Sequence, residues 1–368
     1  MASKHAAQLR GDERDRRSFP SAKLYLLLLL CGADAAAQQV IPLTAVSGYS
    51  PTALWVETFL THFIPEVDQR LAATRTYEID WNTPFGSVAK PGGAFETVQY
   101  GLADIGIITT SFHADKIPFY NLSYVTPFVT TDMGLVVRTV SELHERYPAL
   151  KQLWRNYGQV YLVTAGLVDT YQALMSQPIT ALEDFRGLKM SGVGMNLRYF
   201  EGLGAIAVSS GLADFYTNIA TGLTDGAIVW AEAIVSFKLY EVGPYLVDVR
   251  LGAVSSVAIS ANERTWERLP DEVRRALLAA AAVYRDELAL ETVRRSAAAM
   301  DSFEALGGTI ISLSDEQRRE WAASVPDLAG AWVADIERRG LPGRELLQAY
   351  MNTMRANGQP ILRHWDLE

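Results

Sequence analysis

The sequence predicts an α/β protein of two lobes that share one long helix. Two stretches of alternating strands and helices follow one another, over about residues 40–109 and 160–230. A helical run free of internal Pro and Gly follows Pro270 and ends at the Gly307-Gly308 pair. The length of 368 residues also exceeds that of most single domains.

The first stretch has the order β-α-β-α-β. Short apolar runs predict its strands, and apolar residues at helical spacing predict helices over 53–71 and 95–102. The predicted strands are 40–46, 77–81 and 104–109. This order indicates a parallel, doubly wound sheet with right-handed crossovers. Ligands of such sheets bind at the carboxyl ends of the strands, so we expect a site near residues 47–50, 82–85 and 109–112.

The second stretch repeats this pattern. Its predicted strands are 160–164, 188–191, 205–208 and 226–230, with helices beginning near Thr180, Asn196 and Ala213. We therefore assign residues 38–158 to lobe I, with a return segment at about 247–270, and residues 159–246 to lobe II. A cleft between two such lobes is a preferred place for a small ligand.

The long helix is expected over residues 271–306. At 1.5 Å per residue it would extend about 54 Å, which is longer than one lobe is wide. It could therefore span both lobes, although two helices joined at a kink remain an alternative. Residues 307–368 are expected to form C-terminal helices, the first of them starting at a capping box of Ser314 and Gln317.

Residues 1–37 have the pattern of a signal peptide. Basic residues precede the apolar run 24–30, and small residues precede a cleavage point after Ala37. The basic residues are Arg14, Arg16, Arg17 and Lys23. The apolar run is far shorter than the roughly 20 residues of a membrane-spanning helix. We therefore expect removal of this segment and a periplasmic location.

The export route stays open between two systems. Arg16-Arg17-Ser18-Phe19 resembles the start of a twin-arginine signal, whereas the leucine-dense run is typical of the general secretory route. Cys31 could serve as a lipoprotein cysteine, but Leu30 stands where a small residue would be expected.

Composition and motifs argue against several other functions. The formal net charge is −9, and no run of Lys and Arg lies outside the N-terminal segment, so nucleic-acid binding has no electrostatic basis. Cys31 is the only cysteine and the five histidines are not closely spaced, which excludes thiol chemistry after cleavage and disfavours a metal site. No GxSxG motif and no phosphate-binding glycine loop is present. Binding is therefore favoured over catalysis.

The predicted loops instead carry aromatic and hydroxyl side chains. An apolar cleft with a few fixed polar groups needs these residue types. The candidate ligand-binding residues from these loops are Tyr49, Phe85, Thr109, Tyr171, Tyr216 and Trp230.

Three segments in order resemble the solute-binding proteins of TRAP transporters, the DctP-type, C4-dicarboxylate-binding group. They are FETVQYGLADIG at residues 95–106, LEDFRGLKM at 182–190, and GLGA at 202–205 followed by FYTNIATGLTDG at 215–226. The resemblance covers about residues 40–355. It implies a two-lobed, periplasmic-binding-protein-like fold with a spanning helix. It also implies capture of a small organic acid and its delivery to the small and large subunits of a membrane permease. A monomer and a dimer both remain open.

One position departs from the family pattern. The family usually has Arg after its L-K-I segment, and Arg binds a carboxylate bidentately. Here Ser191 follows Met190. Another cation, a bridging metal or a less charged ligand must then compensate, because an unpaired buried carboxylate is costly. Ser191 and Asn196 complete the candidate ligand-binding set, and Glu232 is a candidate ligand of a bridging cation. No other cofactor is expected.

The resulting hypothesis is a transport binding protein that performs no chemistry. Two alternatives are a periplasmic sensing module that presents its ligand to a receptor, and an enzyme that acts on a small organic acid.

Overall fold

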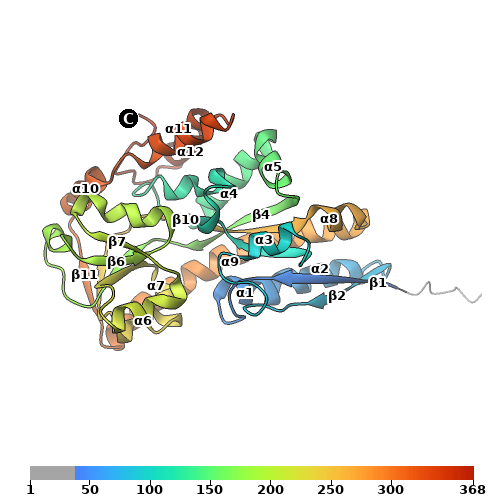
Figure 1. Cartoon of the computed structure of the whole chain (residues 1–368), viewed down its shortest axis with the longest axis horizontal. Helices are drawn as coiled ribbons and strands as arrows, with labels where there is room; N and C mark the ends of the chain where they lie inside the picture. Colours follow the sequence, from blue (N-terminus) through green and yellow to red (C-terminus); the bar gives the residue numbers. More distant parts are fainter. Residues whose placement is uncertain (1–37) are drawn as a thin grey trace, which may run out of the picture. The chain divides into compact units, whose positions relative to one another are not determined.

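The computed structural model describes residues 38–368, whose strands form two sheets (Figure 1). The first sheet has the strand order β2-β1-β3-β10-β4, and the second has the order β11-β9-β5-β8-β6-β7. The predicted signal peptide lies outside the described residues, so its cleavage and export route stay predictions.

The first three strands pair in parallel, as predicted. They are β1 (Gln39–Val46), β2 (Tyr77–Asn82) and β3 (Ile105–Thr109). The crossovers contain α1 (Leu54–Thr58), the π-helical turn η1 (Phe59–Phe63), α2 (Ile64–Ala72) and α3 (Ala94–Gln99). The π-helical turn ends two residues before Pro65, whose ring and missing N–H do not fit a regular helix interior.

The other half of this sheet is antiparallel, which the order of the first three predicted strands did not indicate. Strand β10 (Val254–Asn262) runs antiparallel to both β3 and β4 (Gln159–Val168). Strand β4 thus pairs in the first sheet, although the sequence analysis assigned residue 159 onward to lobe II. Every residue of β10 is buried, and such a strand lacks the alternation from which exposure and pairing are usually inferred.

The second sheet is also mixed. Strand β6 pairs in parallel with β7 and β8, and β9 pairs in parallel with β11, whereas β5 is antiparallel to β8 and β9. The strands are β5 (Gln172–Met175), β6 (Lys189–Gly192), β7 (Ile206–Ser209), β8 (Gly226–Val229), β9 (Tyr245–Asp248) and β11 (Thr309–Ser312). The connecting helices are short: η4 (Leu182–Phe185), η5 (Gly194–Leu203), η6 (Leu212–Asp214), α6 (Phe215–Ala220), α7 (Ala231–Ser236) and η7 (Leu239–Glu241).

The predicted long helix is α9 (Asp271–Ala305), 35 residues without a break. It packs against α2 and β4 of the first sheet and against α7 and β11 of the second (Figure 1). The Tyr284 hydroxyl donates to the backbone carbonyl of Trp55 at 3.0 Å, and the Ser296 hydroxyl donates to the Asp169 carboxylate at 2.9 Å. The helix therefore joins the two sheets. The alternative of two separate helices joined at a kink was wrong, because α9 is one continuous helix.

The C-terminal segment is fixed by three tryptophans. The indole nitrogens of Trp321, Trp332 and Trp365 donate at 2.8 Å to the backbone carbonyls of Tyr199, Pro118 and Pro127, respectively. Its helices are α10 (Asp315–Ser324), α11 (Leu328–Arg338) and α12 (Gly343–Ala356), and the predicted capping box of Ser314 and Gln317 is present. The remaining helices are η2 (Thr110–His113), η3 (Pro118–Tyr124), α4 (Met133–Arg146), α5 (Pro148–Arg155) and α8 (Glu263–Arg268). Among the helices of residues 38–368, none combines the length and apolarity needed to cross a membrane.

Gly166 allows α4 to pack closely on β4. A Cβ at this position would lie 1.7 Å from Met133 Sδ and 2.9 Å from Val137 Cγ1. We expect Gly166→Ala to lower the free energy of unfolding by about 1–3 kcal/mol, because the core must shift to admit the methyl group. Unfolding of the wild-type protein and the variant in urea measures this difference in the free energy of unfolding. Gly93→Ala is the control, since its Cβ would meet no atom closer than 3.5 Å; equal losses in the two variants would contradict the packing argument.

Asp169 follows β4 and lies half-buried beside α9. Burial and, to a smaller extent, the nearby Glu232 carboxylate raise the pKa of its carboxyl to about 6, against the opposing hydrogen bond from Ser296. The folded state thus binds this proton more tightly than the unfolded state, and stability is lost as the pH rises through that pKa.

Replacing Asp169 with Asn removes the titrating charge and keeps an acceptor for Ser296. We expect Asp169→Asn to raise the melting temperature more at pH 8 than at pH 5, measured by thermal denaturation of the unliganded protein. The control is Asp301→Asn, at an exposed position of α9, the helix that carries Ser296. A gain independent of pH, or a loss at pH 8, would show that the Asp169 charge does not destabilise the fold.

Candidate functional site

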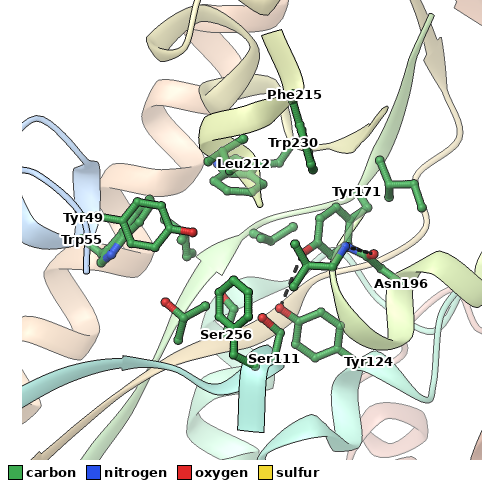
Figure 2. Close-up of a pocket in the computed structure, with 16 residues that line it drawn as sticks. Tyr49, Trp55, Ser111, Tyr124, Tyr171, Asn196, Leu212, Phe215, Trp230 and Ser256 are labelled. Carbon is green, nitrogen blue, oxygen red and sulfur yellow. Dashed lines mark hydrogen bonds between the residues drawn. The ribbon is translucent and has the colours of Figure 1, made fainter. Parts of the chain in front are cut away.

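A cavity lies where elements of the two sheets meet (Figure 2). It contains about 460 Å³ of empty space, part of which is open to solvent. Its lining residues come from both stretches of alternating strands and helices. They are Tyr49, Trp55, Thr109, Ser111, Phe112, Tyr124, Leu167, Val168, Tyr171, Val193, Asn196, Leu212, Phe215, Ile228, Trp230 and Ser256.

Strand ends place many of these side chains. Thr109 is the last residue of β3, and Ser111 follows it in η2. In the second sheet, Asn196 follows β6, and Trp230 comes directly after β8. Carboxyl ends of parallel strands from both sheets therefore contribute to one site, as expected for α/β folds.

A β-bulge brings Ser256 into the site. In the pairing of β10 with β4, Ser255 opposes Gly166 and Val257 opposes Ala165, so Ser256 is the extra residue. A bulge redirects the side chain of the extra residue and bends the strand. The neighbouring Ser255 instead pairs its hydroxyl with that of Ser123 at 3.2 Å.

Aromatic rings form much of the wall. They belong to seven of the 16 lining residues: Tyr49, Trp55, Phe112, Tyr124, Tyr171, Phe215 and Trp230. Tyr49 meets Trp55 edge to face with ring centroids 4.7 Å apart, and Tyr171 meets Trp230 at 6.3 Å. In the view of Figure 2, Phe215 and Trp230 lie on the opposite side of the cavity from Ser111 and Tyr124.

Four hydroxyl groups gather on the side of Ser111 and Tyr124. We call Ser111, Tyr124, Tyr171 and Ser256 the hydroxyl cluster. The Tyr124 and Tyr171 oxygens lie 3.4 Å apart. Burial raises the pKa of both phenols, and the adjacent hydroxyls of Tyr171, Ser111 and Ser256 only partly oppose this for Tyr124. Both tyrosines therefore stay protonated at neutral pH and can donate hydrogen bonds.

Two polar atoms of the lining residues lack a protein partner. The Ser256 hydroxyl and the Trp55 indole nitrogen are buried and form no hydrogen bond within residues 38–368. Buried polar groups are nearly always paired, and an unpaired one costs about 1–3 kcal/mol. Each of the two groups therefore keeps an unused hydrogen-bonding capacity at the cavity wall.

In residues 38–368, the cavity has an uncharged lining, and charged side chains lie only around it. Within the described chain, no Asp, Glu, Lys, Arg or His lines the cavity. Carboxylates lie just outside: burial, Tyr124 and the Asp214 carboxylate together raise the pKa of Tyr49. Glu232 accepts a hydrogen bond from the Trp230 indole at 3.0 Å.

The structure brings five of the eight predicted ligand-binding residues together: Tyr49, Thr109, Tyr171, Asn196 and Trp230. The other three lie outside the cavity lining. Phe85 packs edge to face on Phe59 with centroids 5.9 Å apart. Tyr216 is 37% exposed and donates to Glu241 at 2.9 Å.

Ser191 is the third residue outside the lining. It is fully buried in β6, where its hydroxyl lies 3.1 Å from that of Thr224 and 3.4 Å from the Asn218 amide nitrogen. The residue that replaces the family arginine is therefore satisfied within the second sheet. Ser191→Arg would bury an unpaired guanidinium there.

Glu232, the candidate ligand of a bridging cation, is bonded within the protein. It is 3% exposed, and its two oxygens accept from the Trp230 indole and the Ser236 hydroxyl. Over residues 38–368, no group of three or more His, Cys, Asp and Glu side chains is placed to hold a metal ion. A cation held jointly by Glu232 and a bound solute therefore stays a prediction.

Sequence reasoning missed several lining residues. Ser111 lies two positions beyond Thr109, and Ile228 shares the strand face of Trp230, so strand-end reasoning with period-two alternation could have found both. Tyr124 lies in a 3₁₀ helix and Ser256 in a bulge of a fully buried strand, and neither carries a local sequence signal. Trp55 and Phe215 lie in helices and have the pattern of core residues.

Known proteins share both the sequence pattern and the fold. The profile of DctP, the bacterial extracellular solute-binding protein family 7, matches residues 58–332. The ectoine-binding periplasmic protein TeaA of Halomonas elongata is 25% identical over 292 residues, which cover 74% of this chain and 80% of TeaA.

Solved structures of TRAP solute-binding proteins have the same fold. A protein of Rhodoferax ferrireducens T118 in complex with copurified benzoate has a TM-score of 0.74 at 19% identity, covering 86% of this chain and 98% of its own. A marine metagenome protein specific for aromatic acid ligands has a TM-score of 0.74 at 21% identity, covering 86% and 99%. These matches confirm the predicted two-lobed, periplasmic-binding-protein-like fold. With the profile match over most of the chain, they show that the protein belongs to the bacterial extracellular solute-binding protein family 7, the DctP-type receptors of TRAP transporters.

Proposed function

We propose that this chain captures a small organic acid in the cavity between its two sheets and delivers it to the small and large subunits of a TRAP permease. The carrying observation is the cavity itself, because strand ends from both sheets line it and hydroxyl groups gather on one side. The proposed location is the periplasm, which follows from the extracellular family and from the expected signal peptide.

The chemistry of the wall suits a compact ring compound. Seven of the 16 lining residues are aromatic, and flat apolar walls favour stacking against a planar solute. Relatives of this fold bind ectoine, benzoate and meta-hydroxyphenylacetate, which are small acids built on one ring. We therefore place the ligand of this chain in the same size class.

We propose binding without chemical change. The cavity's serines, Ser111 and Ser256, neighbour the Tyr124 hydroxyl. A nucleophilic serine needs an adjacent base such as His or Lys, and among the described residues that line the cavity there is none.

Ligand-induced stabilisation tests this function. We expect at least one compound from a panel of small organic acids, including ectoine, pyroglutamate, benzoate and meta-hydroxyphenylacetate, to raise the melting temperature. A ligand at 100 times its Kd stabilises by about 2.7 kcal/mol. Mass spectrometry should recover that compound unchanged. A folded protein that responds to no compound of a broad panel, or that converts its ligand, would contradict the proposal.

Ser256 provides a test at the level of one atom. Ser256→Ala removes a buried hydroxyl that has no partner within the described chain, so we expect it to weaken the best ligand by about 3- to 10-fold in calorimetry. Ser210→Ala is the matched control, because that hydroxyl is also buried without a partner in residues 38–368 but lies outside the cavity lining. Equal effects of the two variants would remove Ser256 from the binding site.

A further inference from the structure

We propose that the solute is a zwitterion, an organic acid that carries its own compensating cation. Its carboxylate is held by the hydroxyl cluster, and its cationic group lies against the aromatic faces of Trp230 and Phe215. This inference rests on the proposed function and narrows it, because most small organic acids are anions at neutral pH.

The first step is that, among the described residues, the lining offers no basic side chain to a carboxylate. In the part of the chain that the structure describes, no Lys, Arg or His lines the cavity. Arginines in the surrounding elements are engaged elsewhere: Arg198 pairs with Glu201 at 3.1 Å, and Arg295 pairs with Glu57 at 2.9 Å and with Glu291 at 2.6 Å. Lys90, whose backbone lies beside Gly48, has an exposed side chain outside the lining.

The second step is the sign of the charges nearby. Glu232 is bonded to the Trp230 indole, Asp169 directly follows the lining residue Val168, and Asp214 acts electrostatically on Tyr49. Arg295 shares a surface groove with Glu232, but its guanidinium is already bonded to two other carboxylates. Carboxylates close to a cavity of low dielectric repel an anion and attract a cation.

The third step is that the cavity has two chemically different sides. The hydroxyl cluster offers O–H donors, and hydrogen bonds from neutral donors can hold a carboxylate in its charged form. On the other side in Figure 2, Trp230 and Phe215 present aromatic rings. Because Glu232 takes the indole N–H, Trp230 offers the solute its ring, and an aromatic face attracts a cation.

Together these features penalise net negative charge. The charge of a monoanion would have no positive partner and would lie near the carboxylates of Glu232, Asp169 and Asp214. A dicarboxylate would bring a second negative charge that also has no positive partner. A zwitterion brings both charges into the cavity as a pair and meets a suitable partner for each.

A matched series of pyridine compounds isolates charge from shape. We would measure Kd by calorimetry for trigonelline, a zwitterion, and for nicotinate, nicotinamide and pyridine-3,5-dicarboxylate, which are anionic, neutral and dianionic. The expected order puts trigonelline first, at least about tenfold tighter than nicotinate. Every binder from the organic acid panel is ranked in the same way, and the tightest is expected to be a zwitterion. An anion or a neutral amide as the tightest binder would overturn the inference and leave the proposed function intact. The absence of any binder would refute the proposed function itself.

Three substitutions test which charges set the affinity for the zwitterion. Glu232→Gln keeps an acceptor for the Trp230 indole and removes the charge, so we expect zwitterion affinity to fall by about 3- to 10-fold. Glu241→Gln, at a carboxylate that bonds the exposed Tyr216, is the control and should leave Kd unchanged. Lys90→Ala should also leave Kd unchanged. A tenfold loss in that variant would mean that the protein supplies the cation, and the inference would be wrong.

Discussion

A charge removed from water must be compensated, and this constraint organises the centre of the molecule. The cavity between the two sheets is lined, within residues 38–368, by aromatic, aliphatic, hydroxyl and amide side chains and by no charged one. Asp169 and Asp214 adjoin lining residues in the sequence, and Glu232 accepts a hydrogen bond from the Trp230 indole. An arrangement of this kind can position rings and donate hydrogen bonds, but it gives an anion no countercharge. The zwitterion proposed above meets this constraint, because it brings its own countercharge.

The fold holds that lining in place from several directions. Helix α9 packs on elements of both sheets and contacts the Trp55 carbonyl through Tyr284 and the Asp169 carboxylate through Ser296. The C-terminal tryptophans bond backbone carbonyls at residues 118, 127 and 199, on segments adjacent to the lining residues Tyr124 and Asn196. Shape and polarity of the cavity thus depend on contacts between parts of the chain that are far apart in sequence.

Hydrophobic spacing and capping residues in the sequence were enough to predict several helices and strands. Strands β1, β2 and β3, the 35-residue helix and the Ser314 capping box all have one, and strand ends led to Tyr49, Thr109 and Trp230. The sequence did not predict how β10 pairs with its neighbours. Every residue of β10 is buried, and its antiparallel direction depends on the course of the chain between β9 and β10. The bulge at Ser256 depends on the pairing of β10 with β4. The inward direction of Ser191 depends on the pairing of β6 in the second sheet and on neighbours such as Thr224. Sequence reasoning therefore predicted several residues of the cavity lining, Tyr171 among them, but not the other three members of the hydroxyl cluster.

The most direct test is a crystal structure of the protein with the solute that copurifies with it, together with identification of that solute by mass spectrometry. The account predicts a solute of zero net charge in the cavity, its carboxylate within hydrogen-bond distance of Tyr124, Tyr171 or Ser256, and its cationic group over the Trp230 ring. A solute of net negative charge paired with a metal ion or a basic side chain, or a solute bound away from this cavity, would contradict it.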